Sequence, residues 1–300
     1  MINMKCYIPK YSGFCFGVAL AVEAAYDHIG NSTFMFGEVV HNPAVISDLA
    51  GKGLGLINSL DEIPKGEKAN VLIRAHGVSA DTINEIQNRS LGIIDKTCPR
   101  VKKVHDIVAD ASGRGLDIVI VGTPNHPEVL GIAGWAGTRT VVVRDANDAE
   151  KIIPDRLFPN KGICLVAQTT QNEKKYEEVY RYCSGIFPYI EFNDTICDAA
   201  TVRQEEIRQL AKIVDCVIVI GGKTSSNVTR LFEIASEYNS NTQHIESFAE
   251  LDMTKIIDVK ACLIASGTST PEKSISQVVD HLKLFCLGNG KGFELIRGKT

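Results

Sequence analysis

The sequence predicts an α/β protein of three pseudo-threefold-related domains, each with a small, mainly parallel sheet. Short stretches rich in β-branched residues alternate along the chain with helical stretches such as residues 101–112 and 201–213. This alternation is typical of parallel sheets covered by helices. The length of 300 residues favours two or three domains, because one domain usually holds about 100–200 residues. The strand candidates are residues 4–10, 34–40, 71–75, 91–94, 118–122, 163–167, 189–192, 216–221 and 263–266.

A repeated spacing of cysteines and polar loops supports three domains. Each repeat has the order cysteine, helix, strand, polar loop, helix, strand, polar loop, strand. The first polar loop follows its cysteine by 26 or 28 residues, and the second loop follows the first by 35 to 44. The repeated positions are Cys15, His41 and His76, then Cys98, His126 and Thr169, then Cys197, Ser225 and Ser269.

These repeats set the predicted domain boundaries. The third repeat lacks its closing strand, and the strand at residues 4–10 could supply it. We therefore predict that this strand pairs in the sheet of the third domain and closes a ring of three domains. The predicted domains are residues 15–97, 98–196, and 1–14 plus 197–285, followed by a C-terminal tail at 286–300.

Composition and charge exclude several classes of protein. The net charge is −4 and the sequence pI is about 6.0, so no general basic field is present to bind nucleic acid or an anionic membrane. The apolar runs are far shorter than the ~20 residues of a membrane helix. Residues 14–22 imitate a secretory signal peptide, but the glycine and the cysteine within them favour a buried helix. We expect a cytoplasmic protein.

Seven of the nine cysteines are of two kinds, and the other two, Cys183 and Cys286, carry no motif. An odd number without any C-x-x-C pair argues against a secreted disulfide framework and against short-spaced zinc ribbons. Several lie inside apolar strand candidates, where they are expected to be small buried hydrophobic residues. This group consists of Cys6, Cys164, Cys216 and Cys262.

Cys15, Cys98 and Cys197 each stand just before a helical pattern, where the helix dipole favours a thiolate. Their spacing leaves two interpretations open, namely three separate structural thiols or one shared metal site. Zinc held by three thiolates is possible, but an iron–sulfur cluster suits such widely spaced soft ligands better. Three thiolates on a 4Fe–4S cluster would leave one iron without a protein ligand, as a Lewis acid for a substrate oxygen.

The polar loops all follow predicted strands, and open parallel sheets bind ligands beyond the carboxyl ends of their strands. Three such ends facing one axis would form one central pocket, although three unrelated loops are the alternative. His41, His76 and His126 lie at equivalent strand ends. The stretch 221–227 resembles a phosphate loop without matching the Walker pattern, and 266–269 offers a second loop of this kind. Together with the histidines, these loops suit a small polyanion such as a diphosphate.

Glu128 is the candidate acid. It shares the loop of His126, and Thr169 and Thr170 occupy the second loop of the same repeat. A carboxyl, a hydroxyl and an iron-bound substrate oxygen could form a proton relay. The alternative is that Glu128 caps a helix or is a surface charge.

Taken in order, these motifs resemble those of one family. The chain is similar, over about residues 4 to 285, to the 4-hydroxy-3-methylbut-2-enyl diphosphate reductases, which act last in the non-mevalonate isoprenoid pathway. The motifs that carry the resemblance are Gly13-Phe14-Cys15-Phe16-Gly17-Val18, Val40-His41-Asn42, Ala75-His76-Gly77-Val78, Thr97-Cys98-Pro99, His126-Pro127-Glu128-Val129, Gln168-Thr169-Thr170, Ser225-Ser226-Asn227 and Ser269.

The resemblance implies three α/β domains around a central 4Fe–4S cluster held by Cys15, Cys98 and Cys197. One iron would lack a protein ligand, so a preparation could show a 3Fe–4S form or no cluster. The substrate hydroxyl would bind that iron near Thr169, and Glu128 would deliver protons. The electron donor would be of the ferredoxin or flavodoxin type. The substrate diphosphate would be held by His41, His76, Ser225, Ser226, Asn227 and Ser269, with His126 lining the same pocket.

Two other classes remain as alternatives. One is a cluster lyase of the quinolinate synthase type, which shares the pseudo-threefold plan and needs no external electrons. It is expected to lack the set at 126–128 and the set at 225–227. The other is a non-catalytic cluster or anion sensor, which would leave the role of Glu128 unexplained.

Overall fold

The computed structural model describes residues 3–137, 139–158 and 161–298, and these fall into two compact units. Unit 1 contains the described residues of Met1–Val18, Val40–Ser47 and Asp198–Thr300. Unit 2 contains those of Ala19–Val39 and Asp48–Cys197. Every strand pairing within the described part of the chain is parallel, as the sequence predicted.

Unit 1 is built on one five-stranded sheet, named sheet A here. Its strands are β1 (Asn3–Ile8), β10 (Cys216–Ile220), β11 (Thr242–Ile245), β12 (Ala261–Ser266) and β13 (Gly292–Arg297). They lie in the order β11-β10-β12-β1-β13. The prediction that the N-terminal strand joins the third repeat is confirmed, because β1 pairs with β12 along Lys5–Tyr7.

Unit 2 contains two four-stranded sheets. Sheet B has the order β3-β2-β4-β5 and sheet C the order β7-β6-β8-β9. The strands of sheet B are β2 (Thr33–Phe36), β3 (Gly55–Ile57), β4 (Asn70–Ile73) and β5 (Gly92–Asp95). Those of sheet C are β6 (Asp117–Val121), β7 (Thr140–Val143), β8 (Ile163–Ala167) and β9 (Ile190–Phe192). Both sheets therefore have the same order across the sheet: an edge strand, the strand before the first polar loop, the strand before the second polar loop, and the closing strand of the repeat. Four strands of sheet A, β11-β10-β12-β1, have this order too.

Ten α-helices cover these sheets within the described residues. They are α1 (Phe16–Asp27), α2 (Pro43–Gly51), α3 (Ala80–Asn88), α4 (Pro99–Gly113), α5 (Pro127–Ala133), α6 (Ala146–Arg156), α7 (Glu173–Ser184), α8 (Asp198–Leu210), α9 (Ser226–Tyr238) and α10 (Glu272–Gly288). Short 3₁₀ turns lie at Leu60–Glu62, Phe248–Glu250 and Met253–Lys255. Within the described ranges, no helix has both the length and the apolar character needed to cross a membrane.

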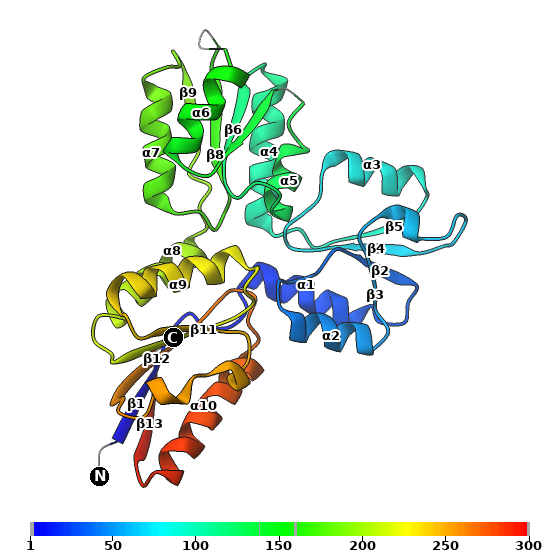
Figure 1. Cartoon of the computed structure of the whole chain (residues 1–300). Helices are drawn as coiled ribbons and strands as arrows, with labels where there is room; N and C mark the ends of the chain where they lie inside the picture. The colour runs from blue at the N-terminus through cyan, green and yellow to red at the C-terminus, as the bar shows by residue number, and fades with distance from the viewer. Residues whose placement is uncertain (1–2, 138, 159–160, 299–300) are drawn as a thin grey trace. The chain divides into compact units, whose positions relative to one another are not determined.

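Three strands, β10 in sheet A and β6 and β8 in sheet C, are buried along their whole length because helices cover both faces. In sheet A, alternate residues of β10 serve opposite faces: Val217 and Val219 pack against α8 and α9, whereas Ile218 and Ile220 pack against α10 (Figure 1). In sheet C, α4 and α5 cover one face, and α6 and α7 cover the other. This two-sided cover leaves the strand ends as the places where polar side chains can gather.

The structure corrects the expected elements in three places. The strand expected at 34–40 ends at Phe36, because Gly37 turns the chain with a φ of 68°. The plan of the repeat omitted the edge strands β3, β7 and β11, and also the helix that precedes each closing strand. The segment expected as a tail at 286–300 completes α10 and adds β13 to sheet A over its described residues, where pairing with β1 stabilises it.

Candidate functional site

Each sheet has two neighbouring central strands from which the chain continues in opposite directions across the sheet. The predicted site residues lie in the loops after the carboxyl ends of these two strands. In sheet C, the chain runs from β6 to the edge strand β7 and from β8 to the closing strand β9, so the switch point lies between β6 and β8. Ligand-binding crevices of parallel sheets lie at such points. The loops after these paired strands hold His126, Glu128 and Thr169 in sheet C, His41 and His76 in sheet B, and Ser225 and Ser269 in sheet A.

In unit 2, the structure joins the two loops of sheet C through a buried carboxylate. Oε1 of Glu128 accepts a hydrogen bond from the backbone N–H of Thr169 at 2.6 Å, and Oε2 accepts one from the Thr169 hydroxyl at 3.0 Å. Glu128 is 3% exposed and Thr169 is 6% exposed. The alternative of a surface charge is therefore wrong. The cap of α5 is His126, whose Nδ1 accepts from the backbone N–H of Glu128 at 3.2 Å.

Burial raises the pKa of Glu128 above its ordinary value, and the two hydrogen bonds from Thr169 oppose this rise only in part. Desolvation disfavours the charged form of a carboxyl group. A carboxyl that holds its proton more firmly than usual is suited to act as a general acid near neutral pH.

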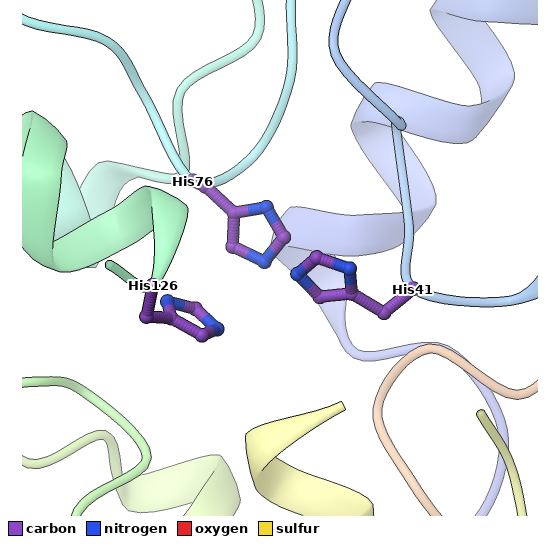
Figure 2. Close-up of side chains that lie close together, drawn as sticks. All are labelled: His41, His76 and His126. Atoms are coloured by element: carbon purple, nitrogen blue, oxygen red, sulfur yellow. The ribbon is translucent and has the colours of Figure 1, made fainter. Parts of the chain in front are cut away.

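Two histidines meet beside this carboxyl. His76, in the loop after β4, and His126, at the start of α5, stand edge to face with ring centroids 5.3 Å apart and an interplanar angle of 88° (Figure 2). Unit 2 thus brings two of the three predicted histidines together from positions 50 residues apart in the sequence. The imidazole nitrogens can donate to an anion or exchange protons in the neutral pH range.

The loop of His76 rests on a stacked pair of rings. Trp135 donates from Nε1 to the carbonyl oxygen of Val78 at 2.9 Å and stacks on His105 at 5.4 Å. Gly77 has a φ of 71°, and a Cβ there would lie 2.6 Å from Cε1 of His105. Burial lowers the pKa of His105 to about 4, so this imidazole stays neutral. The sequence analysis did not identify this support, because nothing in the sequence links these residues to His76.

In unit 1, the two loops of sheet A meet through hydroxyl groups. Ser225 caps α9 by accepting from the backbone N–H of Val228, and Ser269 donates to its Oγ at 3.4 Å. Ser226 and Asn227 form the first turn of α9, where the positive end of the helix dipole favours an anion. Asn227 is 3% exposed, and among the described residues neither Oδ1 nor Nδ2 of its side chain finds a hydrogen-bond partner.

The loop of His41 also belongs to unit 1 and lies against the same region. The carbonyl oxygen of His41 is so close to Gly222 that a Cβ on this glycine would lie 2.1 Å from it. The next residue, Asn42, donates from Nδ2 to the carbonyl oxygen of Ser269 at 3.2 Å. Asn42 belongs to the motif around His41, but the sequence analysis gave it no role. Its position directly after His41 was the one feature of the sequence that could have predicted a role for Asn42.

The three repeat cysteines are confirmed at helix starts, directly before α1, α4 and α8. Their backbone N–H groups donate to carbonyl oxygens at or beside the second polar loop of the preceding repeat, the third repeat being counted as the one that precedes the first. Cys15 bonds to Thr268 at 3.2 Å, Cys98 to Ala75 at 3.0 Å, and Cys197 to Thr169 at 2.8 Å. All three thiols are partly exposed.

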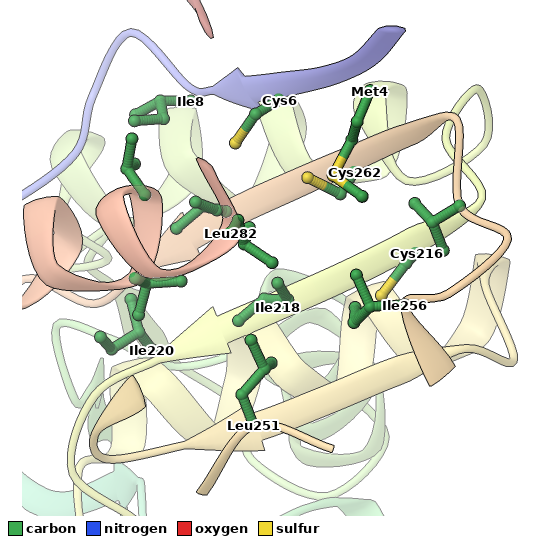
Figure 3. Packing of buried hydrophobic residues seen from close by; sticks show 14 of the residues in the cluster. Met4, Cys6, Ile8, Cys216, Ile218, Ile220, Leu251, Ile256, Cys262 and Leu282 are labelled. Atoms are coloured by element: carbon green, nitrogen blue, oxygen red, sulfur yellow. The ribbon is translucent and has the colours of Figure 1, made fainter. Parts of the chain in front are cut away.

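The other six cysteines are fully buried. Cys6, Cys216 and Cys262 lie in the core of sheet A on neighbouring strands (Figure 3). Burial raises the pKa of Cys216, and likewise that of Cys164, to about 12, so these thiols keep their protons and are poor metal ligands. The predicted division between structural and reactive cysteines therefore agrees with their burial.

The sequence matches the family model described as LytB protein over residues 6–283. A 4-hydroxy-3-methylbut-2-enyl diphosphate reductase from Clostridioides difficile (strain 630) is 38% identical over 283 residues, which cover 93% of this chain and 99% of the relative. A reductase of the same name from Thermoanaerobacter sp. (strain X514) is 39% identical over 286 residues, covering 93% and 97%.

Two solved structures are also similar to this chain. The E-1-hydroxy-2-methyl-but-2-enyl-4-diphosphate reductase from Plasmodium falciparum has a TM-score of 0.89 at 28% identity and covers 99% of this chain and 93% of its own. A structure of (E)-4-hydroxy-3-methyl-but-2-enyl diphosphate reductase, the terminal enzyme of the non-mevalonate pathway, has a TM-score of 0.67 at 34% identity and covers 94% and 99%.

Proposed function

Because the chain belongs to the LytB protein family, we propose that it reduces 4-hydroxy-3-methylbut-2-enyl diphosphate to isopentenyl and dimethylallyl diphosphate. In this reaction two electrons and two protons replace a C–OH bond by a C–H bond and release the hydroxyl as water. The observation that most supports this chemistry is the buried Glu128, held by Thr169 and protonated more readily than an ordinary carboxyl.

We assign the cofactor to Cys15, Cys98 and Cys197, which would hold a 4Fe–4S cluster with one iron free of protein ligands. The donor set fits, because these three thiols are partly exposed at helix starts while the remaining six are buried. Soft thiolates at helix N-termini are the ligands that iron–sulfur clusters require. When bound, the cluster supplies the two electrons and a Lewis acid for the leaving oxygen.

We assign the diphosphate to the loops that hold His41, His76, Ser225, Ser226, Asn227 and Ser269, with His126 lining the same pocket. The buried amide of Asn227 supports this assignment, because a buried polar group without a partner signals a missing ligand. The start of α9 and the paired hydroxyls of Ser225 and Ser269 add donors for phosphate oxygens.

The protons would come through Glu128, Thr169 and His126. Oγ1 of Thr169 lies 3.0 Å from Oε2 of Glu128. Once the carboxyl is protonated this bond can reverse, so that the carboxyl gives its proton to Oγ1 while the hydroxyl proton of Thr169 passes to a substrate oxygen beside it. His126 holds the backbone of Glu128 through the helix cap, which fixes the direction of the carboxyl.

The proposal also covers the domain boundaries, the electron donor and the cellular compartment. We retain the three domains of the sequence analysis, 15–97, 98–196, and 1–14 plus 197–285. The electrons would come from a ferredoxin or a flavodoxin-type donor. The six buried cysteines, free thiols in the described structure, fit a reducing compartment such as the cytoplasm.

The test is anaerobic oxidation of reduced methyl viologen by the protein after its iron and sulfide have been measured. We expect oxidation only after the hydroxylated C5 diphosphate is added, with two viologen radicals consumed per substrate and both isoprenoid diphosphates formed. The matched control is the same alcohol without the diphosphate, which should bind poorly. A protein with a full complement of iron that oxidises no viologen would contradict the proposal and favour the lyase or the sensor.

A further inference from the structure

Arg203 is unusual because its charged side chain is buried. It lies on α8, six residues after Cys197, and only 5% of its surface is exposed. Among the described residues, it is the one arginine or lysine with less than a tenth of its surface exposed. Burying a charged group is unfavourable unless it is well hydrogen-bonded, so its contacts indicate what it holds in place.

The guanidinium of Arg203 joins two segments of unit 1. Nη2 donates to the carbonyl oxygen of Gly13 at 2.9 Å, and Nη1 donates to the carbonyl oxygen of Ser266 at 3.3 Å. The same two residues are joined directly, because the backbone N–H of Gly13 donates to Oγ of Ser266 at 2.9 Å. The planar fork of an arginine can bind two acceptors at once, which the single ammonium of a lysine does less well.

Both segments carry residues of the proposed site. Gly13 stands two residues before Cys15, and Ser266 stands three residues before Ser269. The two segments remain joined one step further along, where the backbone N–H of Cys15 donates to the carbonyl oxygen of Thr268. Arg203 therefore belongs to a short series of hydrogen bonds between two segments. One segment leads to Cys15, a proposed cluster ligand, and the other leads to Ser269, a proposed diphosphate ligand.

We propose that Arg203 is a positioning residue, which holds the loop of Cys15 against the loop of Ser269 from the helix that follows Cys197. The proposal rests on the function proposed above. It assigns a role in both cofactor retention and substrate binding to a residue outside the proposed cluster and diphosphate ligands.

The test compares Arg203→Met, which keeps an unbranched side chain but loses the guanidinium and both hydrogen bonds, with Arg203→Lys, which keeps the charge. For Arg203→Met we expect backbone hydrogen exchange at Gly13 and Cys15 to become about tenfold faster, equivalent to about 1.4 kcal/mol. Iron release to a chelator should also quicken about tenfold, and KM should rise by a similar factor. Arg203→Lys should fall between Arg203→Met and the unchanged protein in all three measurements.

Glu206→Gln is the matched control. One turn further along α8, the carboxylate of Glu206 accepts from the backbone N–H groups of Lys10 and Tyr11 at 3.0 and 3.2 Å. It therefore holds the same N-terminal segment but does not reach Ser266. We expect Glu206→Gln to leave iron release and KM unchanged, because, of these two side chains, Arg203 is the one that bonds to both segments.

A purely structural role would give a different pattern. Backbone hydrogen exchange would then become faster throughout unit 1, and the fraction of active protein would fall without any change in KM. That pattern would overturn the proposal.

Normal hydrogen exchange, iron release and KM in Arg203→Met would overturn it too. If Arg203→Met does not fold, Arg203→Lys decides by the same measures. Should the unaltered protein bind iron yet fail to reduce substrate, the proposed function fails, while exchange and iron release still decide the role of Arg203.

Discussion

Sheets C and A share one strand order, yet their loops at the switch point contain different chemistry. In sheet C, the first loop presents the carboxyl of Glu128 and the second presents Thr169, joined by two hydrogen bonds. In sheet A, the equivalent loops present Ser225 and Ser269, joined hydroxyl to hydroxyl at 3.4 Å. The strand order brings the same two loops together in each case, and the side chains decide whether the junction can donate protons or bind an anion.

The two sheets are alike at the cysteine that follows the closing strand. Each closing strand, β9 in sheet C and β1 in sheet A, leads to a cysteine whose backbone N–H is bonded at or beside the second loop. The comparison therefore predicts that cysteine substitutions act alike in both repeats, whereas substitutions in the polar loops act differently.

The largest effect is expected where the repeats agree. Cys15→Ser and Cys197→Ser should each lose most of the bound iron and sulfide after anaerobic reconstitution, because each removes one of the three proposed thiolate ligands. Cys164→Ala is the control, since this buried thiol lies inside β8 and should not affect iron content. Complete iron retention by either serine variant would remove that cysteine from the ligand set.

Glu128→Gln tests the loop chemistry of sheet C. The amide keeps the shape but cannot deliver a proton, so kcat should fall by about 10²–10⁴-fold with little change in KM or iron content. Glu173→Gln is the matched control, because Glu173 is exposed at the start of α7 beside the same sheet. The measurement is steady-state viologen oxidation, and a kcat near that of the unaltered protein would end the proposed role of Glu128.

Ser269→Ala tests the loop chemistry of sheet A. A lost hydrogen bond to a charged phosphate costs about 1.5–3 kcal/mol, so KM should rise roughly tenfold or more while kcat changes little. Ser184→Ala, at the end of α7, is the control with an exposed serine. If kcat falls and KM stays constant, the two sheets would share one role, and the comparison between them would fail.

The smallest effect concerns stability and pH. Because burial raises the pKa of Glu128, the folded protein binds more protons than the unfolded chain above the ordinary value of 4.5. Stability therefore falls as pH rises through this range, and a glutamine avoids the loss. Guanidinium unfolding of the cluster-free protein between about pH 4 and pH 8 should show Glu128→Gln gaining stability over the unaltered protein as pH rises. A difference that is independent of pH would contradict the raised pKa.

The sequence predicted the buried middle strands and the edge strands β5 and β9, which agree with the strands expected at 91–94 and 189–192, but it missed the edge strands β3, β7, β11 and β13. Residues 118–122 and 216–221 are continuous runs of β-branched and small residues, because both faces of their strands are buried. Among the missed edge strands, β3 has only three residues, β11 is short and mixed in polarity, and β13 is half exposed. Their strand state depends on pairing along one side, which local sequence does not reveal.

By itself, the sequence determined the repeat, the three cysteines at helix starts and the polar loops at strand ends, because spacing along the chain carries this information. Only the tertiary structure decided that Glu128 is buried against a threonine 41 residues away, and that its pKa is consequently raised. The same holds for Arg203, whose two acceptors lie 190 and 63 residues away. Desolvation and hydrogen bonding depend on which distant segments meet, and this is settled only when the sheets and helices have packed.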